Sequence, residues 1–103
     1  MSNSYENKRT WEIDTAVDVD GVFLVDDFTW HPSAKGQDLD IEDTAENDIW
    51  TTRSVASASN HEAYGIETKV YGSKSPLKCR GIHIKTIDGG LLYVHLNDAS
   101  PLA

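Results

Sequence analysis

Apolar and polar residues alternate along the chain from Trp11 to Val19, and this pattern constrains the fold more than any other feature. Every second side chain of a β-strand points to the same face, so the alternation predicts a half-buried strand with a carboxylate-bearing outer face. Asp20-Gly21 follows, a dipeptide favoured in two-residue type I′ turns, and a second run extends from Val22 to Trp30. We therefore predict a hairpin closed at Asp20-Gly21. Its register pairs Val19 with Val22, Val17 with Leu24, Ile13 with Phe28, Trp11 with Trp30 and, on the outer face, Asp14 with Asp27.

A second hairpin is predicted near the C-terminus, where alternating runs at 80–87 and 91–96 flank Asp88-Gly89-Gly90. A three-residue loop with one glycine in the left-handed region is a common connection between such strands. The register pairs Ile82 with Leu96, Ile84 with Val94 and Thr86 with Leu92 on the core face, and His83 with His95 and Lys85 with Tyr93 on the outer face.

The remaining segments give weaker signals. Alternation at 38–42 predicts a short edge strand, and alternation at 64–71 predicts a strand whose free edge could pair with a second copy of the chain. Asp43-Thr44-Ala45-Glu46 fits a capping box, but the Thr and Ser residues that follow are poor helix formers, so 44–60 is a short helix, a strand, or one after the other.

We expect a mainly β or α+β fold, built on two antiparallel hairpins with at most one short helix. Residues 1–10 are expected to form a flexible arm, 11–97 a single globular domain and 98–103 a tail.

Charge is distributed unevenly in this chain of net charge −8. Residues 12–48 carry twelve acidic side chains and only one basic side chain, Lys35, whereas residues 69–85 carry five basic side chains and no acidic one. This excess of acidic side chains disfavours direct binding to nucleic acid, which needs clustered Lys and Arg. It favours a basic protein partner instead. The alternative is an acidic face that only keeps the protein soluble. The candidate partner-binding residues are Glu12, Asp14, Asp18, Asp27, Asp38, Asp40, Glu42 and Asp43.

These carboxylates suggest one specific hypothesis, a small inhibitor such as an immunity protein, antitoxin or anti-defence protein. Side chains on one face of a strand repeat at about 6.6 Å, close to the phosphate spacing along a DNA strand. A carboxylate array with this spacing could imitate nucleic acid and block a basic, nucleic-acid-acting protein.

Two alternatives to a binding protein start from the aromatic and histidine residues. The predicted neighbours His83, His95, Lys85 and Tyr93 could act as general acid and base in a small hydrolase or nuclease-like enzyme, or the two histidines could share a metal ion. Neither a third ligand nor a nucleophile is placed beside them by the sequence. The paired Trp11 and Trp30 belong to the core or form a sugar-binding platform.

Cysteine content and hydropathy bear on the cellular compartment. The single cysteine, Cys79, excludes an intramolecular disulfide. The N-terminal residues lack the apolar core of a signal peptide, and no apolar run reaches the roughly 20 residues of a membrane helix. We expect a cytoplasmic protein that needs no cofactor and contacts no membrane.

Overall fold

The computed structural model describes residues 3–56 and 65–103, and these residues form strands joined by turns, without a helix. The mainly β class predicted from the sequence is confirmed. Because the described part has no helix, it has none long and apolar enough to cross a membrane. The strands are β1 (Thr10–Ile13), β2 (Val17–His31), β3 (Asp38–Glu42), β4 (Asp48–Arg53), β5 (Glu67–Val70), β6 (Leu77–Ile87) and β7 (Leu91–Leu96).

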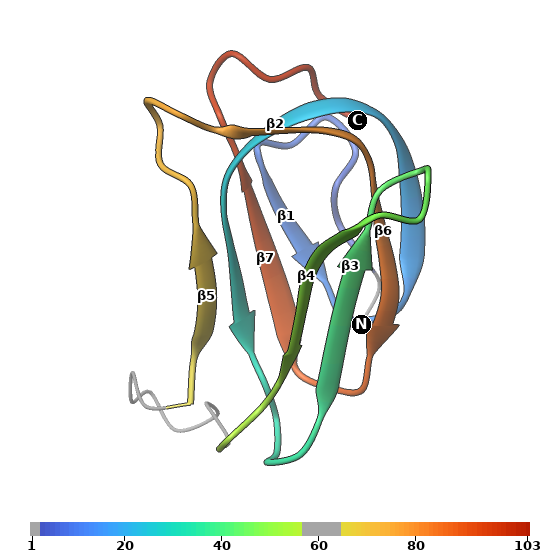
Figure 1. Ribbon diagram of the computed structural model, residues 1–103, viewed down its shortest axis with the longest axis vertical. Coiled ribbons are helices and arrows are strands. Elements are labelled where there is room, and N and C mark those ends of the chain that lie inside the picture. Colours follow the sequence, from blue (N-terminus) through green and yellow to red (C-terminus); the bar gives the residue numbers. More distant parts are fainter. Residues whose placement is uncertain (1–2, 57–64) are drawn as a thin grey trace.

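All seven strands belong to one antiparallel sheet in the order β1-β7-β2-β6-β3-β4, with β5 attached to β2. The long strand β2 curves over the top of the molecule in Figure 1, and its two halves have different neighbours. Residues 17–25 pair with β6, whereas residues 25–31 pair with β7 and residues 27–30 pair with β5. The sheet therefore folds into two layers that share β2. One layer consists of β1, β7, β5 and the second half of β2, and the other consists of β6, β3, β4 and the first half of β2.

The hairpin predicted at Asp20-Gly21 is wrong, because Gly21 lies inside the continuous strand β2. Gly21 has a φ of 134°, and the register against β6 shifts between Val19 and Val22. A glycine that permits positive φ serves a bulge as readily as a turn. The bulge changes which side chains face inward, so Phe23 is 2 % exposed and Val22 is 39 % exposed.

The register predicted for that hairpin is overturned as well. Trp11 and Trp30 do not pair with each other, since each lies beside β7, with Trp11 opposite Val94 and Trp30 opposite Leu92. Asp27 lies opposite His95 on one side and Val70 on the other, and not opposite Asp14.

The second predicted hairpin is also wrong in its pairing, although both of its strands exist. Strand β6 pairs with β2 and β3, whereas β7 pairs with β1 and β2. The connection at 88–90 therefore passes from one layer to the other. It is fixed by the indole N–H of Trp30, which donates to the Gly89 carbonyl over 3.0 Å. Gly90 has a φ of 81° and packs against the His31 carbonyl.

Within 44–56, the described part of the ambiguous stretch 44–60, the chain forms a turn followed by a strand, and 57–60 lie outside the described residues. The Asp43 carboxylate accepts the backbone N–H groups of Ala45 and Asn47, and this replaces the helix start suggested by the capping-box pattern. Strand β3 occurs where it was predicted, but it lies between β6 and β4 instead of at an edge. In the 64–71 segment, Tyr64 lies outside the described residues, and pairing of β5 with a second copy stays a prediction.

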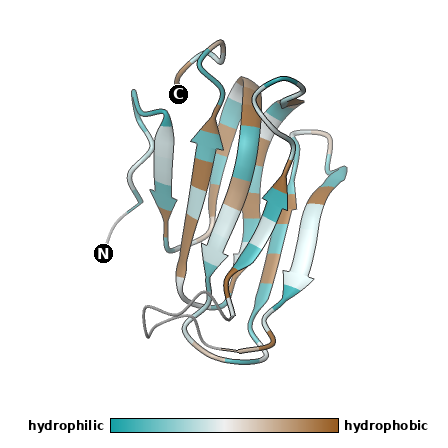
Figure 2. Ribbon diagram, turned by 90° about the vertical axis from the view of Figure 1, so that its left-hand side faces the viewer, coloured by the Kyte–Doolittle hydropathy of each residue, from teal (hydrophilic) through white to brown (hydrophobic). Residues whose placement is uncertain are grey.

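The core lies between the two layers. Trp11 and Phe23, from opposite layers, meet edge to face with ring centroids 5.2 Å apart, and Phe28 stacks on Trp50 of β4 at 6.2 Å. Figure 2 shows hydrophobic and hydrophilic residues alternating along the strands, as expected when one face of each strand is buried. Both outer faces of this sandwich therefore remain available for function.

The segments before β1 and after β7 contact each other. Ser4 forms a bridge to Glu12 of β1, and the Asn7 N–H donates to the Ala103 carbonyl over 3.0 Å. The Arg9 guanidinium donates to the carbonyls of Asn97 and Ser100, each over 2.9 Å. These bonds connect the segment before β1 with the segment after β7.

Candidate functional site

The outer face of β3 carries three of the predicted partner-binding residues. Leu39 and Ile41 are fully buried, so the alternating positions Asp38, Asp40 and Glu42 project outward. Asp40 accepts a hydrogen bond from the Thr51 hydroxyl over 2.9 Å, and Asp38 forms an ion pair with Arg53 over 2.8 Å. The Arg53 guanidinium lowers the pKa of the Asp38 carboxyl below its ordinary value. These contacts hold the Asp38 and Asp40 carboxylates in place on the outer face of β3.

The first half of β2 and strand β6 extend this acidic row. His83 lies opposite Asp18 on one side and opposite Glu42 on the other, so the three residues form a line across three strands. The His83 Nε2 atom is 2.8 Å from Asp20, and its Nδ1 atom is 3.7 Å from Asp18. Lys85 lies 3.4 Å from the same Asp18 carboxylate.

We call this surface the carboxylate face. It brings together carboxylates from two stretches that are distant in sequence, 18–20 and 38–48: Asp18, Asp20, Asp38, Asp40, Glu42, Asp43 and Asp48. Its side chains are accessible, since Asp18, Asp20 and Asp38 are 52 %, 75 % and 45 % exposed. Among the described residues, the permanent cations in contact with these seven carboxylates are Lys85 and Arg53, so the cluster keeps a negative charge. Asp20 and Asp48 belong to it although neither was among the eight predicted partner-binding residues. Asp20 shares the outward parity of Asp18, so alternation along the chain could have indicated it.

The other predicted partner-binding residues lie elsewhere. Glu12 is opposite Tyr93 on the outer face of the other layer, and Asp27 is opposite His95 on that same face. Asp14 follows β1 and is half-buried in the connection to β2. The eight predicted carboxylates therefore occupy both sides of the sandwich and do not form one surface.

The predicted cross-strand pair of His83 and His95 does not exist. His83 is on β6 and contacts Asp18 and Asp20, whereas His95 is on β7 and its Nδ1 atom is hydrogen-bonded to Asp27. Lys85 accompanies His83, and Tyr93 accompanies His95. The four residues of the enzyme hypothesis are split between two faces, which overturns the arrangement on which that hypothesis depended.

The positions of the described residues give no support for metal binding, a reactive thiol or a sugar-binding platform. Within residues 3–56 and 65–103, no group of three or more His, Cys, Asp or Glu side chains is placed to hold a metal ion. Cys79 is buried, and burial raises the pKa of its thiol to about 11, which suppresses the reactive thiolate. Trp11 and Trp30 are both fully buried, so they belong to the core and cannot form a sugar-binding platform.

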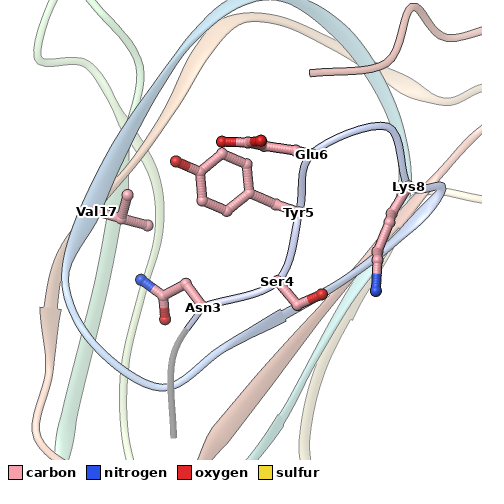
Figure 3. A pocket seen from close by; sticks show the side chains of 6 residues that line it. All are labelled: Asn3, Ser4, Tyr5, Glu6, Lys8 and Val17. Atoms are coloured by element: carbon pink, nitrogen blue, oxygen red, sulfur yellow. The ribbon is translucent and has the colours of Figure 1, made fainter.

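A surface hollow lies between the N-terminal segment and the start of β2. It has a volume of about 510 Å³ and is lined by Asn3, Ser4, Tyr5, Glu6, Lys8 and Val17. Figure 3 shows the Tyr5 ring lying within this hollow, with Asn3 and Val17 facing each other across it. A smaller hollow of about 320 Å³ adjoins it at Val17 and reaches Asp18 and Lys85. The linings mix one acid with one base in each case and select no ligand.

Comparison with known proteins gives no relative: no family model, curated protein or solved structure matches the chain. The functional argument therefore depends on the two outer faces themselves.

Proposed function

We propose that this protein binds a basic protein partner through the carboxylate face. The observation that carries the proposal is the line Asp18–His83–Glu42, which joins carboxylates from β2 and β3 across β6 on one accessible surface. Clustered surface carboxylates attract a positively charged partner over long distances and accelerate its capture.

The form we favour is an inhibitor of a basic, nucleic-acid-acting protein, in the manner of an immunity protein, antitoxin or anti-defence protein. Asp38, Asp40 and Glu42 repeat along one strand at the spacing that suits imitation of a phosphate backbone. The sheet holds them in place before binding, so little conformational entropy is lost on association. A reducing compartment such as the cytoplasm suits the free thiol of Cys79.

The experiment uses a charge-reversed pair and a matched control pair. Wild-type protein, Asp40→Lys with Glu42→Lys, and Lys74→Glu with Lys78→Glu are used to capture proteins from the native cells. Candidates are identified by mass spectrometry, and association rates are then measured with the purified partner. We expect the β3 reversal to slow association about tenfold or more, and the control reversal to leave it unchanged or faster.

Circular dichroism and thermal unfolding would first establish that both double variants fold. Loss of binding in the control pair, with full binding by the β3 pair, would show that the partner is anionic and would refute the proposal.

A further inference from the structure

A second cluster of polar and aromatic side chains lies on the outer face of the β1–β7–β2 layer. We call it the Tyr93 cluster, and it consists of Glu12, Asp27, Thr29, His31, Tyr93 and His95. Neither the core nor the carboxylate face uses these side chains. They come from three adjacent strands, with Tyr93 in the middle.

The aromatic rings of the cluster are arranged around Tyr93. The His95 ring is parallel to the Tyr93 ring, with an interplanar angle of 5° and centroids 6.3 Å apart. The His31 ring meets Tyr93 edge to face, at 77° and 5.3 Å. Because His95 is 39 % exposed, a planar group can approach this pair of rings from solvent.

The charged groups of the cluster are the carboxylates of Asp27 and Glu12, which only accept hydrogen bonds. Asp27 accepts from the Thr29 hydroxyl over 3.2 Å and from Nδ1 of His95. A histidine that donates its Nδ1 proton to a carboxylate presents the lone pair of Nε2 on the other side of the ring. In this neutral tautomer His95 offers an acceptor beside the face of Tyr93.

Glu12 adds a carboxylate on the other side of Tyr93. The two residues are direct cross-strand neighbours, and side chains in such positions are about 5 Å apart at Cβ. Within residues 3–56 and 65–103, no side chain forms a hydrogen bond or ion pair with the Glu12 carboxylate. The described contacts of the cluster also include no Lys or Arg side chain.

Acceptors beside an aromatic face select a planar cation. A guanidinium group stacks on aromatic rings and presents five donors in its plane, whereas an ammonium group is compact and strongly hydrated. An anion would meet two carboxylates. We propose that the Tyr93 cluster binds the arginine side chain of a peptide or protein, with the guanidinium against Tyr93 and its donors directed to Glu12 and to Nε2 of His95.

The proposal is independent of the carboxylate face and is tested with defined peptides. The probes are acetyl-Gly-Gly-Arg-Gly-Gly-amide and its lysine and citrulline counterparts, titrated into the full-length protein while NMR signals of the Tyr93 and His95 rings are followed. We expect the arginine peptide to shift these signals, the lysine peptide to bind about threefold more weakly or worse, and the citrulline peptide not to bind.

Protein variants separate the role of the ring from that of the charge. Tyr93→Leu should remove the binding, Tyr93→Phe should retain it, and Glu12→Gln should weaken it about threefold. The double variant Asp40→Lys with Glu42→Lys should bind the arginine peptide like the wild type, so failure of the carboxylate-face proposal leaves this result unaffected. Thermal unfolding of Tyr93→Leu would show whether it folds, and the Glu12→Gln result stands even if it does not.

Three outcomes would overturn the inference. They are equal affinity for the arginine and lysine peptides, unchanged binding in folded Tyr93→Leu, and peptide-induced shifts confined to the carboxylate face. An oligosaccharide that shifts the Tyr93 signals while the arginine peptide does not would assign the cluster to a sugar instead.

Discussion

The Nε2 atom of His83 lies 2.8 Å from a carboxylate oxygen of Asp20, although the two residues are 63 positions apart in sequence. This contact joins β6 to the first half of β2 at the bulge around Gly21. The His83 side chain is only 11 % exposed, whereas Asp20 is 75 % exposed, so the imidazole is covered and the carboxylate stays accessible. The contact therefore both stabilises the sheet and orients a residue of the carboxylate face.

The first prediction concerns stability in acid. The hydrogen bond from His83 lowers the pKa of Asp20 below its ordinary value of 3.8, with a smaller contribution from Thr44. A lowered folded-state pKa adds stability above the unfolded pKa, and this stability disappears as the pH falls below 3.8 toward the folded pKa. We expect the melting temperature of Asp20→Asn to fall less between pH 5 and pH 3 than the melting temperature of the wild type. The matched control is Asp98→Asn, an exposed carboxylate in the C-terminal segment, which should follow the wild-type curve.

The second prediction concerns the direction of side chains after Gly21. Phe23 is 2 % exposed and packs against Trp11 of the opposite layer, so Phe23→Ala should destabilise the protein by about 3–5 kcal/mol. Its neighbour Val22 is 39 % exposed, and Val22→Ala should change stability by about 0.5 kcal/mol or less. Urea unfolding of both variants measures the difference. A larger effect at Val22 than at Phe23 would restore the hairpin register.

The failure of that register shows what alternation can and cannot predict. Alternation is a local property, so it placed β3 and β7 at their observed positions. The single strand predicted over 11–19 is wrong, because 14–16 separate β1 from β2. Pairing depends on distant residues, and Gly21 is compatible with either a turn or a bulge. Phe23 and Val25 argued against the hairpin, because that register would have exposed these two large apolar side chains, which the structure buries.

For the candidate sites too, the pattern within one strand was predictable from the sequence, whereas the contacts between strands were not. The outward row of Asp38, Asp40 and Glu42 followed from alternation within one strand and is observed. The pair of His83 and His95 depended on strand pairing, and it failed with the second hairpin. The carboxylate partners of both histidines come from β2, more than 60 residues earlier in the chain. Local sequence patterns do not encode contacts over that separation.

The third prediction compares two glycines with nearly the same backbone conformation. Gly36 has a φ of 80° with no atom near the position of a Cβ, so Gly36→Ala should cost about 1–2 kcal/mol from the left-handed conformation alone. Gly90 has a φ of 81°, and a Cβ there would lie 2.1 Å from the His31 carbonyl oxygen. Backbone must move to relieve that clash, so Gly90→Ala should cost about 2 kcal/mol more than Gly36→Ala. Chemical denaturation of the two variants decides this, and equal losses would mean that the 88–90 connection does not pack against His31.

The last prediction concerns Cys79 and alkaline pH. Burial of the thiol, with a smaller effect of Asp43, raises its pKa from 9.0 to about 11. The folded state therefore favours the protonated thiol, and the resulting stability is complete below pH 9 and is lost as the pH rises from 9 through about 11. A pKa difference of about two units corresponds to about 2.7 kcal/mol in full. About 2 kcal/mol of this is lost between pH 8.5 and pH 11, where the folded thiol is about half ionised. We expect wild type to lose about that much more stability than Cys79→Ala between pH 8.5 and pH 11, although Cys79→Ala starts lower because it leaves a small cavity. Tyr71, whose pKa is raised by burial and also by Cys79, is present in both proteins, so only the part of its shift that Cys79 causes adds to the difference. Parallel stability curves for the two proteins across this range would show that the thiol is not buried as described. Thiol labelling at pH 8 gives an independent check, since the reaction should be slow in the folded protein and become fast at the urea concentration where the sheet unfolds.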